Sequence, residues 1–301
     1  MKYEPLVSVI MSTRNRRSMV ATAISSVLNQ TYRNFEFIIV DGASTDGTGD
    51  VVKSFTDERI RYFYETDDSS HENCLRIAVE QSRGDLIALQ DDDDEWYPEK
   101  LEKQVTVFVE SDSSLGVVYC WEQIYDWSNK SILKETNQSL RGDVYLSLLE
   151  APGYGGGSLM MVRREVFKEF PFGERITALP SDYLWCLRVS KKYKFDYVPE
   201  VLSRTNVNHN YGRLTNLACG GFSYKHAIEL TETILKMFEA DFDKHPSKRR
   251  YHYRSLINNS IKTKDVNRFV RYYIKAFPLL KGNFRYYGYP IRLLTTMIGI
   301  K

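Results

Sequence analysis

The chain has 301 residues, of which 43% are hydrophobic and 27% charged, a composition typical of a globular protein with a sizeable core. No segment approaches the ~20 apolar residues that a membrane-spanning helix needs, so we expect none. The net charge is only +2, but residues 244–301 carry 14 lysines and arginines against one acid, Asp265, which leaves 27 cations and 38 acids elsewhere. The net charge is therefore +13 for residues 244–301 and −11 for the rest of the chain, which indicates two regions with different partners.

The cysteines argue against a zinc or redox site. All four lie far apart, without a CxxC pair, at Cys74, Cys120, Cys186 and Cys219. They are typical of reduced thiols in a cytoplasmic protein. The apolar run at residues 6–11 follows Glu4 and Pro5 and does not resemble a signal peptide.

The first third of the chain alternates predicted strands with predicted helices. Apolar runs at residues 7–11, 35–40, 60–64 and 86–89 predict strands, and apolar positions at helical spacing predict helices over 20–28, 51–55 and 73–82. This alternation predicts an α/β fold with a mostly parallel sheet. Polar segments 12–15, 41–46 and 91–94 each follow a strand, so we expect all three to meet in one crevice. No GxGxxG or GxxxxGKS loop is present to bind phosphates there.

Four consecutive aspartates, residues 91–94, follow the fourth predicted strand. Adjacent carboxylates repel, and each resists ionisation unless a cation lies between them. Hard oxygen ligands suit Mg²⁺ or Mn²⁺. An EF-hand is unsupported, because Trp96 stands where that loop needs glycine. The alternative is a solvated acidic turn.

Less regular sequence follows. Residues 115–121 and 159–162 predict strands, 123–141 a polar loop, and the asparagines near His209 another loop. Helical periodicity returns over residues 222–242, 248–261 and 266–277, the last ending before Pro278. We expect one domain over residues 1–220 and a basic, aromatic-rich helical region over 221–301.

These residues carry a family resemblance. The segments VSVIMSTRN (7–15), SSVLNQTY (25–32), FEFIIVD (35–41), STDGT (44–48) and DDDDEWYPEKL (91–101) together resemble the opening of family 2 glycosyltransferases. The resemblance implies a GT-A fold, a Rossmann-like, mostly parallel central sheet flanked by helices, here with a C-terminal helical extension. It also implies a nucleotide diphosphate-sugar donor, Mn²⁺ or Mg²⁺, and inversion at the anomeric carbon.

When the family's functional positions are matched to this chain residue by residue, the resemblance implies a donor site. It assigns Ser12, Thr13 and Asp41 to the base and ribose, and Asp91 and Asp92 to the ribose. Donor contacts are also expected from Asn15 and Arg76, although Arg76 equally fits a surface helix. Asp93 would bind the metal, and His209 would bind the metal or the diphosphate, or be a hydrogen-bonding surface residue. Gly42 stands where the family often has a second acid.

Asp182 is the expected catalytic base. It begins a predicted helix, where the dipole favours an anion, and the alternative is a helix cap. The family has an acidic pair at this place, and Ser181 replaces its first member. A sugar hydroxyl is a poor nucleophile until a positioned carboxylate takes its proton, typically worth ~100- to 10,000-fold.

The sequence therefore predicts a metal-dependent inverting glycosyltransferase with a glycan or lipid-linked hydroxyl acceptor, in polysaccharide or glycolipid synthesis. A non-catalytic nucleotide-sugar-binding or scaffold module is the alternative. A nucleotidyltransferase would also use aspartates and a metal, but the Gly-rich basic loop typical of that class is not found in this sequence. Residues 244–301 predict contact with an anionic membrane, hence a peripheral position at the inner face of the cell membrane. A purely structural basic extension is the alternative there. No recognition motif supports nucleic-acid binding.

Overall fold

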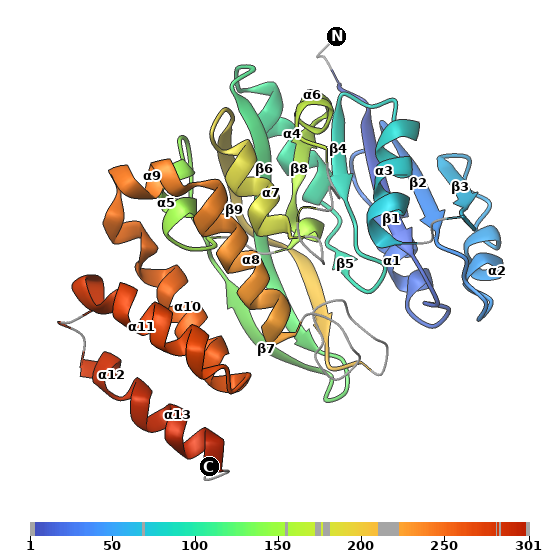
Figure 1. Cartoon of the computed structure of the whole chain (residues 1–301). Coiled ribbons are helices and arrows are strands. Elements are labelled where there is room, and N and C mark those ends of the chain that lie inside the picture. Colours follow the sequence, from blue (N-terminus) through green and yellow to red (C-terminus); the bar gives the residue numbers. More distant parts are fainter. Residues whose placement is uncertain are drawn as a thin grey trace. The chain divides into compact units, whose positions relative to one another are not determined.

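A computed structural model describes residues 4–67, 70–153, 156–171, 176, 181–209, 223–280, 282 and 284–298. The chain divides into two compact units (Figure 1). The first comprises Met1–Val144, Gly153–Glu174 and Trp185–Tyr211, and the second Tyr145–Pro152, Arg175–Leu184 and Gly212–Lys301. The predicted domain boundary at residues 220 and 221 lies outside the described residues and stays a prediction.

The first unit is built on one mixed sheet. Its described strands are β1 Val7–Thr13, β2 Phe35–Asp41, β3 Ile60–Tyr64, β4 Leu86–Leu89, β5 Glu95–Trp96, β6 Leu115–Asp126, β7 Ser131–Thr136, β8 Met161–Arg163 and β9 Lys194–Val207. Their order is β3-β2-β1-β4-β8-β6-β9-β5, with β7 on β6. The pairs β1/β2, β1/β4, β2/β3 and β6/β9 are parallel. The predicted parallel start of the sheet is confirmed.

Strands β1 and β2 are buried along their whole length, as parallel strands covered on both faces must be. Their β-branched and aromatic side chains suit that environment. The helices of this unit are α1 Val20–Leu28, α2 Thr48–Lys53, α3 His71–Gln81, α4 Lys100–Val109 and α6 Arg164–Glu169. Helix α7, Asp182–Val189, has its first three residues in the second unit and the rest in the first.

Several local predictions were wrong. The predicted polar loop 123–141 contains the end of β6 and all of β7. Asn206, assigned to the predicted loop around His209, belongs to β9, whereas Asn208 and His209 follow the strand and Asn210 lies outside the described residues. Among the strands that the structure describes, β7 pairs only with β6, and its side chains are largely exposed. Backbone pairing therefore holds this strand, and no apolar pattern marks it in the sequence. Residues 157–159 form a 3₁₀ turn before β8, which runs antiparallel to β4.

The described part of the second unit is helical. Its helices are α5 Tyr145–Glu150, α8 Tyr224–Met237, α9 Glu239–Lys244, α10 Arg249–Lys262, α11 Val266–Leu280, α12 Phe284–Tyr287 and α13 Tyr289–Ile298, with a 3₁₀ turn at Pro246–Lys248. Pro278 lies inside α11, so the predicted helix end before it was wrong. Side chains of α8, α10, α11, α12 and α13 share one buried cluster. None of the described helices combines the length and apolar character needed to cross a bilayer.

Gly84 lies just before β4, against the backbone at the start of β1. A Cβ there would stand 2.6 Å from both the Leu6 carbonyl oxygen and the Ser8 backbone nitrogen, neither of which can rotate away. We expect Gly84→Ala to lower the free energy of unfolding by about 1–3 kcal/mol, the usual cost of overpacking. Gly282→Ala is the matched control, because an added Cβ meets nothing within 4 Å. Urea unfolding of both variants tests this, and equal stabilities would contradict it.

Candidate functional site

The acidic turn lies directly after β4, at the carboxyl edge of the sheet. Carboxylate oxygens of Asp91, Asp93 and Asp94 lie within 4.8 Å of one another, and the last two residues are buried. Three convergent carboxylates form the hard oxygen ligand set that Mg²⁺ and Mn²⁺ prefer. The chemistry of these residues therefore fits a divalent cation better than a solvated turn.

Asn206 of β9 holds this turn in place. Its side-chain amide donates to the Asp93 carbonyl oxygen at 2.8 Å and to Glu95 Oε1 at 3.2 Å. Its backbone N–H donates to Asp94 Oδ1 at 3.1 Å. Gln90 adds a 2.7 Å bond to the Asp94 carbonyl oxygen. Because Asp94 accepts from the backbone of β9, it anchors the turn as well as completing the acidic set.

Asp92 faces a different partner. Arg16, in the loop after β1, places Nε 3.2 Å from Asp92 Oδ1. Burial, reinforced by the charge of Asp93, raises the pKa of Asp92 to about 6 despite this arginine. The raised pKa reports an excess of buried negative charge, which an added cation would relieve.

Two histidines lie near Asp93. His209, just after β9, is buried, and its Nε2 lies 3.1 Å from Asp93 Oδ2. His71 begins α3, and burial lowers its pKa although the charges of Glu72 and Asp93 act the other way. Sequence reasoning singled out His209 but missed His71 and Arg16, because neither belongs to a motif. Only the position of Arg16 in a loop after a strand could have indicated it.

The loops after β1 and β2 interlock. Thr13 pairs with Asp41 in the register of the two strands. Asn15 Oδ1 accepts from the Thr45 backbone at 2.9 Å, and Ser44 Oγ accepts from the Asn15 backbone at 2.9 Å. Asn15 adopts φ 53°, a left-handed conformation that asparagine tolerates better than most residues. Together with the Arg16–Asp92 pair, these contacts confirm that the three polar segments meet.

Asp41 is fully buried at the end of β2. Its Oδ1 accepts from the Ser44 backbone at 2.8 Å, and its Oδ2 accepts from the Tyr62 hydroxyl at 2.9 Å. Burial and the adjacent carboxylate raise the pKa of Tyr62 above its ordinary value. Tyr62 was missed by sequence reasoning, since nothing in β3 distinguishes it from its neighbours.

The remaining predicted donor residues separate into two groups. Ser12 and Thr13 are buried at the end of β1. Arg76 instead lies on an exposed face of α3, with its guanidinium on Glu80 and, at 2.7 Å, on Asn73. Its position favours the surface-helix interpretation that the sequence left open, and its donor role stays a prediction.

Asp182 belongs to the second unit. The Ser181 hydroxyl accepts from the Leu184 backbone at 3.2 Å, so Ser181 makes the capping bond and Asp182 is the first residue of α7. Tyr183 donates to the Leu148 carbonyl oxygen at 2.7 Å, and its ring stacks on His252 of α10. Helices α5 and α10 therefore fix the turn that carries Asp182.

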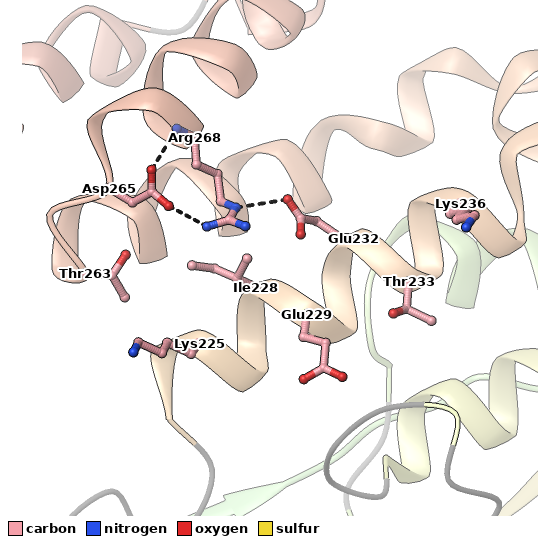
Figure 2. Close-up of a pocket in the computed structure, with 9 residues that line it drawn as sticks. All are labelled: Lys225, Ile228, Glu229, Glu232, Thr233, Lys236, Thr263, Asp265 and Arg268. Atoms are coloured by element: carbon pink, nitrogen blue, oxygen red, sulfur yellow. Dashed lines mark hydrogen bonds and ion pairs between the residues drawn. The ribbon is translucent and has the colours of Figure 1, made fainter.

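A groove of about 520 Å³ runs along α8 in the second unit (Figure 2). Figure 2 shows Arg268 between Asp265 and Glu232, with its guanidinium bonded to both. The other charged residues of the wall are Lys225, Glu229 and Lys236, so it carries three cations and three acids in all. Because its charges are balanced and its arginine is engaged by two carboxylates, the groove lacks the features of a diphosphate site.

Comparisons with known proteins agree on one family. Residues 8–170 match the family described as Glycosyl transferase family 2. An uncharacterized glycosyltransferase of Rickettsia typhi is 30% identical over 212 residues, covering 68% of this chain and 65% of that protein. The putative teichuronic acid biosynthesis glycosyltransferase TuaG of Bacillus subtilis is 39% identical over 110 residues, covering 36% and 44%. The chain thus spans less than two thirds of either relative's length.

Two solved structures show the same fold. The mannosyltransferase PcManGT from Pyrobaculum calidifontis, in complex with GDP-Man and Mn²⁺, has a TM-score of 0.60 at 17% identity, covering 99% of this chain and 87% of that one. TarS 1–349 of S. aureus, in complex with UDP-GlcNAc, has a TM-score of 0.61 at 14% identity, covering 97% and 92%. The expected GT-A fold with C-terminal helices is confirmed. With the family match covering more than half of its length, the chain belongs to glycosyl transferase family 2.

Proposed function

We propose that this protein is a metal-dependent inverting glycosyltransferase that moves a sugar from a nucleotide diphosphate-sugar to a hydroxyl acceptor. The convergence of Asp91, Asp93 and Asp94 beside the interlocked loops of β1 and β2 carries the proposal. Two structures of the same fold were determined with nucleotide-sugars, GDP-Man and UDP-GlcNAc, and one of them with Mn²⁺. Both observations support a donor site at this edge of the sheet.

In this proposal Asp93 binds Mn²⁺ or Mg²⁺, with the neighbouring acids of the turn contributing oxygens. A cation held there would supply positive charge opposite the diphosphate leaving group. His209 either joins the ligands or orients Asp93, since its Nε2 contacts that carboxylate at 3.1 Å. Such a neighbour fixes the geometry of a metal ligand.

The donor's base and ribose would lie against Ser12, Thr13, Asn15, Asp41, Asp91 and Asp92. Burial of Asp41 and its two protein donors make it a rigid member of that set. Rigid placement reduces the entropy lost when a ligand binds.

Asp182 is the proposed base. It accepts the proton of the acceptor hydroxyl as that oxygen bonds to the anomeric carbon and the bond from that carbon to the diphosphate oxygen breaks. A single displacement of this kind inverts the anomeric configuration and needs no covalent enzyme intermediate. The name of the teichuronic acid relative supports a glycan or lipid-linked acceptor in cell-surface polysaccharide or glycolipid synthesis.

Removal of the metal should abolish donor binding. In a thermal-shift panel of GDP, UDP and their sugar conjugates, we expect stabilisation with Mn²⁺ or Mg²⁺ and its loss with a chelator. Asp93→Asn should weaken nucleotide binding by at least about tenfold, or about 1.4 kcal/mol. Asp85→Asn, at the exposed opposite end of β4, is the control. Undiminished binding in chelator would refute metal dependence.

Asp182→Asn separates catalysis from binding. We expect sugar transfer to fall by ~100- to 10,000-fold, because the hydroxyl loses its proton acceptor. Nucleotide and Mn²⁺ binding should persist, and Asp243→Asn, exposed and paired with Arg249, should transfer normally. Transfer that survives Asp182→Asn removes this residue from the mechanism. Binding without transfer in the unmodified protein would instead favour a non-catalytic module.

Tyr62→Phe tests the support of Asp41. The variant leaves a buried carboxylate oxygen without its hydroxyl donor, so we expect a loss of about 1–3 kcal/mol in stability together with weaker nucleotide binding. Tyr64→Phe is a matched control on the same strand, since Tyr64 is exposed and its hydroxyl makes only a 3.4 Å bond. If the two variants behave alike in calorimetric unfolding and nucleotide titration, Tyr62 has no supporting role.

A further inference from the structure

Helix α11 has a second apolar face besides the one in the core. Phe269, Tyr272, Ala276 and Leu280 are buried in the helical cluster. Four other large apolar residues are between 39% and 65% exposed, namely Val266, Val270, Ile274 and Phe277. At ~100° per residue these four positions fall within about 80° of the helix circumference. The helix therefore presents a continuous exposed apolar stripe.

Helix α13 repeats this arrangement. Tyr289 and Leu293 are buried in the same cluster, while four apolar residues are 47% to 68% exposed, namely Ile291, Leu294, Met297 and Ile298. They fall within about 120° of its circumference. Both helices are joined through Tyr286, whose ring packs on Tyr273 of α11 and contacts Tyr289 of α13. We call these two stripes the apolar face of the second unit.

Two exposed cations follow the apolar stripe of α11 around that helix. At ~100° per residue, Arg271 lies about 60° beyond the edge of the stripe and Lys275 about 100° beyond it. The only acid of residues 244–301, Asp265, is paired with Arg268. Asp265 therefore does not neutralise Arg271 or Lys275.

We infer that the apolar face of α11 and α13 binds an anionic lipid bilayer, lying in the plane of the interface. The stripes would enter the boundary between headgroups and acyl chains, and the bordering cations would contact anionic headgroups. Scattered exposed apolar residues need no explanation, but two ordered stripes on neighbouring helices of one core do.

A second copy of the chain fits this face less well. Self-association through the stripe of α11 would bring together two copies of residues 244–301, each with a net charge of +13. Like charges at such an interface oppose binding, whereas anionic headgroups are complementary to them. The inference concerns the second unit alone, so it can fail while the proposed transfer reaction stands.

Flotation of the full chain with vesicles tests the inference. We expect binding to phosphatidylcholine vesicles containing about one third phosphatidylglycerol, and at least about tenfold weaker binding to phosphatidylcholine alone, because each cation near the surface adds ~1 kcal/mol. Arg271→Glu with Lys275→Glu should reduce anionic binding to the neutral-vesicle level. Lys134→Glu on β7, an exposed lysine of the first unit, is the charge control.

A second pair of variants tests the contribution of the apolar stripes of α11 and α13. Ile274→Asp with Leu294→Asp should abolish flotation, whereas Ile132→Asp with Leu133→Asp, equally apolar and 56% and 53% exposed on β7, should leave it unchanged. Thermal unfolding and the nucleotide thermal shift show whether each variant is folded and whether the first unit is intact. Equal binding to both vesicle types, binding to neither, or a dimer in lipid-free solution that Ile274→Asp dissociates would overturn the inference.

Discussion

The interaction on which the site depends is the attachment of the acidic turn to β9. Residues 91–94 would repel one another in isolation, yet Asn206 binds both the Asp93 carbonyl oxygen and, through its backbone, the Asp94 carboxylate. Strand β9 can reach the turn because it continues to Val207 and pairs with β5 at Glu95 and Trp96. The sheet thus supplies hydrogen bonds that offset part of the cost of gathering carboxylates, and a cation would offset more.

The site is assembled from loops on a rigid frame. Strands β1, β2 and β4 are parallel neighbours, so their carboxyl ends open on one edge, the usual place for ligands in such sheets. The loops are in turn fixed by short polar contacts, such as those between Asn15 and Ser44 and Thr45. Preorganisation of this kind suits the proposed role of the site, the orientation of a flexible nucleotide-sugar.

The proposed base, Asp182, belongs to the helical unit and not to the unit that contains the sheet. Asp182 begins α7, whose first turn belongs to the helical unit and contacts α5 and α10 through Tyr183. Ser181, which replaces the first acid of the family's pair, caps the helix by accepting from the Leu184 backbone. The C-terminal helices are therefore more than an appendage, since they hold the residue on which transfer is proposed to depend.

The sequence alone determined the first parallel strands and the helices between them, the helices α8, α10 and α11, the acidic cluster and the family, because each depends on a pattern among a few neighbouring residues. The pattern of apolar residues predicts β1 and α11, and the four adjacent aspartates can be recognised without knowledge of the fold. Only the tertiary structure decided the partners of those aspartates. Arg16 is 76 residues from Asp92 and His209 is 116 from Asp93, so their pairing depends on how strands pack. Strand β7 was likewise invisible in the sequence, since backbone bonds to β6 rather than buried side chains hold it.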